Sequence, residues 1–355
     1  MKFSIHFLPA KYGDSIWIEY GEPDNLKYIL IDGGTGGTRK HINQMIDKIP
    51  GTNKKLELLV VTHIDKDHIE GILSFLEQPE LGITIKEIWF NGWCHLPGNP
   101  AIEHFGAVQG ERLTAAILKN GILWNKKFES GPVVLPDDNA NTSVNLAGQF
   151  KLVLLSPSNE NLANLKPVWD KEVREAGLEP GFGLAEPEET ESETEAFGEG
   201  SPDIETLAST IFHEDEAAAN GSSIAFMAEF EGKRVLLAGD AFPGVILNSL
   251  EKIYGNGKVS VDLFKLSHHA SAHNTSPELL KKVKCNNFII STNGSIYKHP
   301  SIETIARVIK SAGKNTKLYF NYRTKFNEIW DDNLLMEEYK YEAIYPDTEG
   351  IRIDL

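Results

Sequence analysis

The chain has only two cysteines, Cys94 and Cys285, in 355 residues. Two are too few for a disulfide framework or for a zinc site built from thiolates, which fits a reducing compartment and a cytoplasmic protein. Any bound metal would therefore have to be held by histidine and carboxylate side chains.

Long apolar runs are also missing. No stretch approaches the roughly 20 apolar residues that a membrane-spanning helix needs, so we expect no contact with a membrane. Residues 1–20 alternate apolar and polar side chains as a strand does, and they lack the pattern of a secretory signal. The glycines at 33, 34, 36 and 37 are not followed by Gly-Lys-Ser or Gly-Lys-Thr, which argues against a phosphate-binding loop.

Basic charge is scarce, and the formal net charge is -16. Thirteen Asp and Glu and no Lys or Arg lie in residues 176–216, so the rest of the chain carries only -3. We predict an acidic insertion at 159–219, because this stretch breaks the pattern of strands and helices and is rich in Glu, Gly, Pro and Ser. A solvated mobile loop is the simplest interpretation; a lid, a nucleic-acid mimic or a tether for a partner are the alternatives.

Apart from the insertion, short apolar runs alternate with segments of helical spacing. Strands are expected within 3–8, 16–20, 28–34, 56–61, 85–91, 150–158, 261–271, 286–294 and 349–355, and at a hairpin that turns at Glu231 and Gly232. Helices are expected at about 39–49, 69–78, 99–121 and 297–313. This alternation predicts an α/β architecture in a single domain spanning 1–355.

Polar residues recur where the predicted strands end. Asp32 follows "YILI", the segment "THIDKDH" follows "LELLVV", Asp240 follows "VLLAG", and His268 and His269 follow "LFKLS". One such strand end is unremarkable, but α/β proteins present their binding groups there, so together they predict one site assembled from separate segments.

The spacing within "THIDKDH" suits metal ligands. His63 and Asp65 can face the same side, and Asp67 and His68 at the start of a helix can reach a second centre. Imidazole and carboxylate suit zinc, and a carboxylate-rich set also admits manganese. Asp240 could bridge two such ions and position a hydroxide between them.

"THIDKDHIEG" resembles the HxHxDH signature of the metallo-β-lactamase fold hydrolases, with Asp65 in place of the second His. This variant is similar to the HxDxDH of the branch that contains the domain of the competence DNA-uptake protein ComEC. "FLPAKYGDSIWIEY", "YILIDGG", "NGSSIAF", "LLAGDA", "LSHHAS" and "YKHPS" resemble further motifs of that branch, in the same order. The resemblance implies a four-layer αββα sandwich of the metallo-β-lactamase type with the insertion inside it.

The resemblance also implies the ligands of two divalent metal ions, zinc first and manganese as the alternative. The first ion would be held by His63, Asp65 and Asp240. The second would be held by Asp67, His68, Asp240 and one of the pair His268 and His269, of which we favour His269. Catalytic roles would fall to Asp67, Asp240 and His299, the last in contact with the substrate phosphate or leaving group.

Residues that support the ligands or contact substrate are expected around them. Asp32 matches a position that holds ligands by hydrogen bonds. The other candidates are Asn220, Ser223, Ser271 and Lys298. The sequence departs from the family pattern in two places. The His of the family's third motif is absent, and Asn220 occupies that region. Ala270 replaces the usual Gly of the histidine turn.

The function that we predict is a metal-dependent hydrolase of phosphodiester bonds, a nuclease acting on nucleic acid or nucleotides by a metal-bound hydroxide. Three alternatives stay open. The substrate could be a small nucleotide or choline phosphodiester, the substrate could be an ester or lactone, or the chain could be a non-catalytic assembly subunit. A partner protein from a multi-gene bacterial system is compatible with the sequence, which is silent on oligomeric state.

Overall fold

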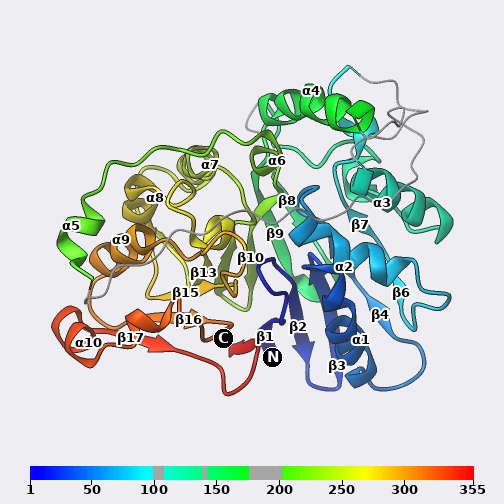
Figure 1. Cartoon of the computed structure of the whole chain (residues 1–355). Helices are drawn as coiled ribbons and strands as arrows, with labels where there is room; N and C mark the ends of the chain where they lie inside the picture. The colour runs from blue at the N-terminus through cyan, green and yellow to red at the C-terminus, as the bar shows by residue number, and fades with distance from the viewer. Residues whose placement is uncertain (99–107, 138–141, 176–201) are drawn as a thin grey trace.

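The computed structural model describes residues 1–98, 108–137, 142–175 and 202–355, which form two large sheets with helices outside them (Figure 1). The first sheet runs in the order β18 (Ile351–Asp354), β1 (Lys2–Phe7), β2 (Ile16–Glu22), β3 (Asn25–Ile31), β5 (Leu58–Val60), β7 (Ile88–Trp89). The second runs β17 (Tyr341–Ile344), β16 (Thr316–Phe320), β15 (Asn287–Ile290), β13 (Leu263–Lys265), β11 (Lys233–Leu237), β10 (Ala225–Phe230), β9 (Lys151–Ser156), β8 (Ser143–Asn145). Two short pairs join β4 (Lys55–Leu56) to β6 (Thr84–Ile85) and β12 (Val259–Ser260) to β14 (Val283–Lys284).

Three apolar clusters define the layers. Strand β3 illustrates the arrangement. Ile29 and Ile31 face the second sheet, and Tyr28 and Leu30 face the helices, because side chains alternate between the two faces of a strand. One cluster lies between the sheets and the other two lie under the helices of each side. The predicted four-layer αββα sandwich is therefore confirmed.

The helices cover the outer faces of the two sheets (Figure 1). On the first sheet lie α1 (Arg39–Lys48), α2 (Lys66–Leu76) and α3 (Val108–Lys119). On the second lie α7 (Pro243–Tyr254), α8 (Pro277–Lys282), α9 (Ile302–Ala312) and α10 (Asn333–Tyr339). No helix among the described residues is both long and apolar enough to cross a bilayer.

The predicted insertion is not a loop throughout. Residues 159–175 form helix α4 (Asn159–Glu175), which buries Leu162, Leu165 and Trp169 against the helical layer of the first sheet. After it come α5 (Ile204–Ala208), packed on α9, and α6 (Ala218–Gly221), packed on α4. The interpretation as a mobile loop was wrong for these parts because composition hid the apolar faces of short helices. The acidic stretch 176–201 lies outside the described residues.

Helix α2 packs so closely against the loop after β3 that the two backbones form hydrogen bonds with each other. Gly71 donates its N–H to the Gly34 carbonyl at 2.9 Å, and Gly33 donates to the His68 carbonyl at 2.7 Å. A Cβ at Gly71 would lie 1.8 Å from the Gly33 carbonyl oxygen. This close approach brings the first turn of α2 beside Asp32.

We expect Gly71→Ala to lower the free energy of unfolding by about 3 kcal/mol, because neither backbone can move aside without losing these hydrogen bonds. Urea unfolding followed by circular dichroism would measure the change. Gly257→Ala is the matched control, since a Cβ there meets no described atom within 4 Å. Equal stability of the two variants would contradict the close contact.

A buried acid in α3 predicts a pH effect on stability. Glu111 is 1% exposed, and within the described chain neither carboxyl oxygen has a hydrogen-bond partner. Burial raises the pKa of Glu111 to about 9. The folded state therefore binds more protons than the unfolded state between roughly pH 4.5 and 9, and the free energy of unfolding should fall as pH rises through that window.

Glu111→Gln should remove this dependence and stabilise the protein by about 1–3 kcal/mol at pH 8, with little effect at pH 4. Denaturant unfolding at both pH values would measure it. A difference between variant and parent that is the same at pH 4 and pH 8 would show that ionisation of Glu111 plays no part.

Candidate metal centre

The predicted site residues lie at the carboxyl ends of parallel strands from both sheets. Strand β3 leads to Asp32, and β5 leads to the segment 62–68 in the first sheet. Strand β11 leads to Asp240, and β13 leads to His268 and His269 in the second. Because parallel strands end at one edge, four segments far apart in sequence meet there.

Asp240 lies at the centre of the cluster. Its Oδ2 atom faces the Nε2 atoms of four histidines, at 3.3 Å for His68, 3.8 Å for His269, and 3.9 Å for His63 and His268. Three of these rings are almost completely buried, and His268 keeps 23% of its side chain exposed. The backbone N–H of Asp240 donates to Ser223 Oγ at 3.0 Å, so Ser223 helps to position this aspartate.

The other ring nitrogen of each buried histidine is already committed. His68 Nδ1 lies 2.8 Å from Asp32 Oδ2, and His269 Nδ1 lies 2.8 Å from the Ser291 carbonyl oxygen. His63 Nδ1 lies 3.0 Å from Thr62 Oγ1, whose hydroxyl donates to Asp32. These contacts place the proton on Nδ1 and leave Nε2 as the electron-pair donor, as metal ligands require.

The two remaining predicted ligands come from the segment before and inside the first turn of α2. Asp67 Oδ2 lies 3.2 Å from His269 Nε2 and 3.9 Å from His68 Nε2. Asp65 Oδ2 lies 3.5 Å from His63 Nε2, and its side chain is 43% exposed. Asp67 is thus enclosed in the cluster, whereas Asp65 lies at its open side.

The arrangement fits a bound cation. The Nε2 atoms of His63, His68 and His269 are buried and, within the described residues, have no hydrogen-bond partner. Burial opposes protonation of His68 and His269, yet Asp240 and neighbouring carboxylates raise the pKa of both imidazoles. Within the described residues, three groups of possible ligands have donor atoms within 4.8 Å of one another, and all three share His68: one adds His63 and Asp240, one adds Asp67 and His269, and one adds Asp14 and Asp32.

Sequence reasoning missed two buried charges behind Asp240. Lys265 in β13 is 0% exposed and forms an ion pair with Asp14. Its Nζ lies 3.8 Å from Asp240 Oδ1, the oxygen that faces away from the histidines, and donates to the Gly239 carbonyl at 3.1 Å. The signal was a lysine inside the apolar run "VDLFKLS", since lysine is almost never fully buried without a partner.

The end of the predicted insertion also reaches the site. Asp215 Oδ2 accepts hydrogen bonds from Asn220 Nδ2 at 2.7 Å and Asn274 Nδ2 at 2.9 Å, and lies 3.6 Å from His268 Nδ1. Asn274 Oδ1 lies 3.0 Å from the same His268 nitrogen. Asn220, expected in place of a ligand, thus belongs to the network that orients His268.

The histidine turn has an unusual backbone. His268, His269 and Ala270 all have positive φ, at 47°, 54° and 65°. Left-handed conformations cost a non-glycine residue of order 1 kcal/mol. Ala270 is therefore in a backbone conformation that favours glycine.

The remaining predicted residues surround this turn. Ser271 builds it, through its N–H to the His268 carbonyl at 2.8 Å. Lys298 has φ 56° and donates its N–H to the Gly294 carbonyl. The His299 ring lies 5.5 Å from the His268 ring between centroids, and burial lowers the pKa of His299 to about 3, helped by the charges of His268 and His269. His299 is therefore neutral near pH 7.

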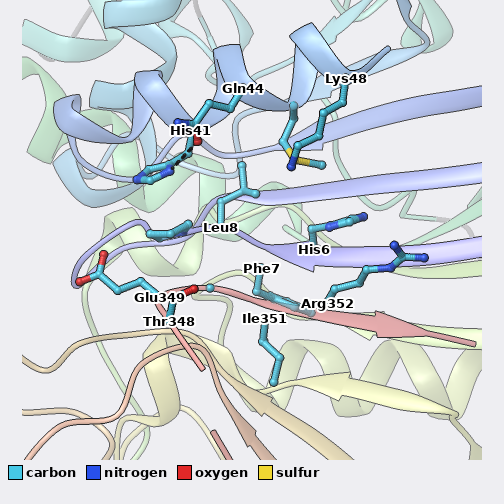
Figure 2. A pocket seen from close by; sticks show the side chains of 13 residues that line it. His6, Phe7, Leu8, His41, Gln44, Lys48, Thr348, Glu349, Ile351 and Arg352 are labelled. Atoms are coloured by element: carbon cyan, nitrogen blue, oxygen red, sulfur yellow. Dashed lines mark hydrogen bonds between the residues drawn. The ribbon is translucent and has the colours of Figure 1, made fainter. Parts of the chain in front are cut away.

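A separate pocket of about 490 Å³ lies between α1 and the strands β1 and β18 (Figure 2). His6, His41, Lys48, Glu349 and Arg352 are among the residues that line it. None of the predicted site residues lines this pocket, and we assign it no role.

No family model matches the chain, and no curated protein matches it in sequence. Solved structures that are similar over most of its length include the metallo-β-lactamase fold protein YhfI from Bacillus subtilis, at 11% identity and TM-score 0.43, covering 100% of both chains. CmlA, a diiron β-hydroxylase from Streptomyces venezuelae, matches at 11% identity and TM-score 0.41, with 100% of this chain and 54% of that one. Human tRNase Z, short form, matches at 10% identity and TM-score 0.33, covering 80% of this chain and 92% of that one. None is similar enough to assign an activity.

Proposed function

We propose that the chain is a metal-dependent hydrolase of phosphodiester bonds, with nucleic acid or nucleotides as the first substrate class. One observation carries the proposal: three buried imidazole nitrogens without partners among the described residues surround the Asp240 carboxylate. Leaving such groups unsatisfied costs free energy, so a buried cluster of this kind indicates a ligand that completes it.

Two divalent ions would fit the donors. His63, Asp65 and Asp240 would hold one, and Asp67, His68, Asp240 and His269 the other. Imidazole and carboxylate donors suit zinc and also admit manganese. Such ions supply Lewis-acid stabilisation of charge on a phosphoryl group and lower the pKa of water.

The surrounding side chains hold this constellation in place. Asp32 accepts hydrogen bonds from the Thr62 N–H and hydroxyl, each at 2.7 Å, and from His68 Nδ1, so it fixes the orientation of a ligand without facing Asp240. Neutral His299 can donate one N–H to a substrate or leaving-group oxygen. Asp32 thus positions a ligand and His299 donates a hydrogen bond, and neither role requires the fold to move.

The phosphodiester substrate class is supported by the motif resemblance. Asp65 adds a carboxylate at the open side of the cluster, where the commoner motif has a neutral histidine. The HxDxDH pattern is similar to that of the ComEC-like branch, and that relation is an analogy. Small nucleotides or choline phosphodiesters, esters or lactones, and a non-catalytic assembly role are the competing functions.

The test is hydrolysis by protein loaded with Zn²⁺ or Mn²⁺ of short oligonucleotides, plasmid DNA, a p-nitrophenyl ester and a lactone. Phosphodiester cleavage that is lost in Asp67→Ala supports the proposal. Cleavage of lactones with every phosphodiester intact would overturn it. If neither occurs and a partner complex survives Asp67→Ala with Asp240→Ala, the assembly role is favoured.

A further inference from the structure

Aromatic rings form a continuous series from the buried cluster to the surface. The centroids of His269 and His268 are 5.9 Å apart, and those of His268 and His299 are 5.5 Å apart. The Tyr297 ring stacks on His299 at 6.1 Å with an interplanar angle of 27°, and Tyr12 meets Tyr297 edge to face at 6.3 Å. The two tyrosines therefore lie at the rim of the candidate metal centre.

Tyr297 is more exposed than the rings that lead to it. It is 56% exposed, whereas His269 is 0% exposed. Burial of part of the phenol raises the pKa of Tyr297, and the negative charges of Asp67 and Asp65 add to this. An exposed aromatic face beside a polar site is available to a planar group of the substrate.

The backbone around the tyrosines is held by hydrogen bonds between loops. Asn293 donates its N–H to the Lys11 carbonyl at 2.8 Å, and Lys11 donates its own N–H to Tyr322 Oη at 2.8 Å. A Cβ at Gly294 would lie 2.5 Å from the Phe326 ring, so that loop is closely packed. A rim that is already ordered loses little conformational entropy when it binds a ligand.

Each tyrosine also has a lysine beside it in the chain, Lys11 before Tyr12 and Lys298 after Tyr297. Aromatic faces next to lysines are the combination that binds the bases and phosphates of single-stranded nucleic acid.

We propose that Tyr297, with Tyr12 beside it, is a stacking subsite for the nucleobase next to the phosphodiester bound at the metal centre. The inference rests on the proposed function, because the subsite is useful only if the phosphodiester carries a base. It selects nucleotides and single-stranded nucleic acid over choline phosphodiesters and lactones. Tyr297 is a specificity-determining residue and takes no part in bond cleavage.

Binding without turnover tests the subsite first. Isothermal titration of zinc-loaded protein with adenosine 5′-monophosphate and with ribose 5-phosphate compares ligands that carry the same phosphate. We expect the nucleotide to bind about tenfold tighter, since stacking on an aromatic side chain contributes 5- to 150-fold for each base. Tyr297→Ala should remove the preference and Tyr297→Phe should keep it.

The control for loop disturbance is Ile296→Ala. It shortens a 39% exposed side chain next to Tyr297 and changes no aromatic residue. It should keep the preference. No preference in the parent protein, or a preference that survives Tyr297→Ala, would overturn the subsite. A preference that depends on Tyr297 in a protein that cleaves no phosphodiester would support the subsite and contradict the proposed function.

Cleavage then gives a second readout. The kcat/KM for an oligonucleotide should exceed that for the same oligonucleotide with an abasic residue at the cleavage position by about tenfold, and the ratio should fall towards one in Tyr297→Ala. A ratio that is equal in the parent and in Tyr297→Ala would contradict the inference.

Discussion

Asp240→Asn should weaken metal binding and hydrolysis together. The substitution keeps the shape of the side chain and its backbone hydrogen bond to Ser223, but it removes the negative charge that faces four imidazole nitrogens. Because this carboxylate belongs to both proposed ligand sets, metal affinity should fall by more than about 100-fold and activity by about 1,000-fold. Inductively coupled plasma mass spectrometry and titration with Zn²⁺ would measure the metal.

In the metal-free protein, burial opposes ionisation of Asp240, but His68 and His269 offset it and hold the pKa of this carboxyl well below its usual range. The charge therefore stabilises the folded state at neutral pH, so the apo form of Asp240→Asn should be less stable than the parent. Asp347→Asn is the matched control, because Asp347 is exposed and not among the predicted site residues. If Asp240→Asn binds two equivalents of Zn²⁺ as tightly as the control does, Asp240 is not the bridging residue.

Lys265→Met should cost about 3–5 kcal/mol of stability and also weaken the metal centre. The ammonium group neutralises Asp14 and lies 3.8 Å from Asp240 Oδ1, and all three side chains are buried. Removing one partner of a buried ion pair leaves the other charge uncompensated. Urea unfolding of the metal-free protein measures the first effect.

The double variant Asp14→Asn, Lys265→Met separates the two roles of the lysine. Stability should be largely regained, because no unpaired charge is left on Asp14. Metal affinity should stay reduced by about 10-fold or more, since the ammonium group that faces Asp240 Oδ1 is then missing. Electron paramagnetic resonance of the manganese-loaded protein would detect a change in coupling between the ions. Full metal affinity in the double variant would show that Lys265 only balances Asp14.

The arrangement of layers could be predicted from the sequence because each strand and helix carries its own periodic signal. "YILI" alternates between two apolar faces, and the hairpin turn at Glu231 and Gly232 forms as expected, with Phe230 opposite Lys233. The signal failed at α4, because a few apolar residues spaced along a largely polar segment resemble a loop in composition.

Part of the candidate site could also be predicted from the sequence, and part could not. The motifs predicted that Asp32, Asp67, His68, Asp240 and the histidine pair would meet, since strand ends of an α/β fold share an edge, and the structure brings them together. Which metal they bind, and membership of the ComEC-like branch, stay predictions.

By itself, the sequence determined many of the strands and helices and which polar residues follow the strands, because these depend on neighbours along the chain. Only the tertiary structure decided that Lys265 and Asp14 lie behind Asp240, that Asp215 reaches His268, and that Tyr297 continues the row of rings to the surface. Those contacts join residues from different elements, and their distances depend on how two sheets pack, which no local pattern encodes.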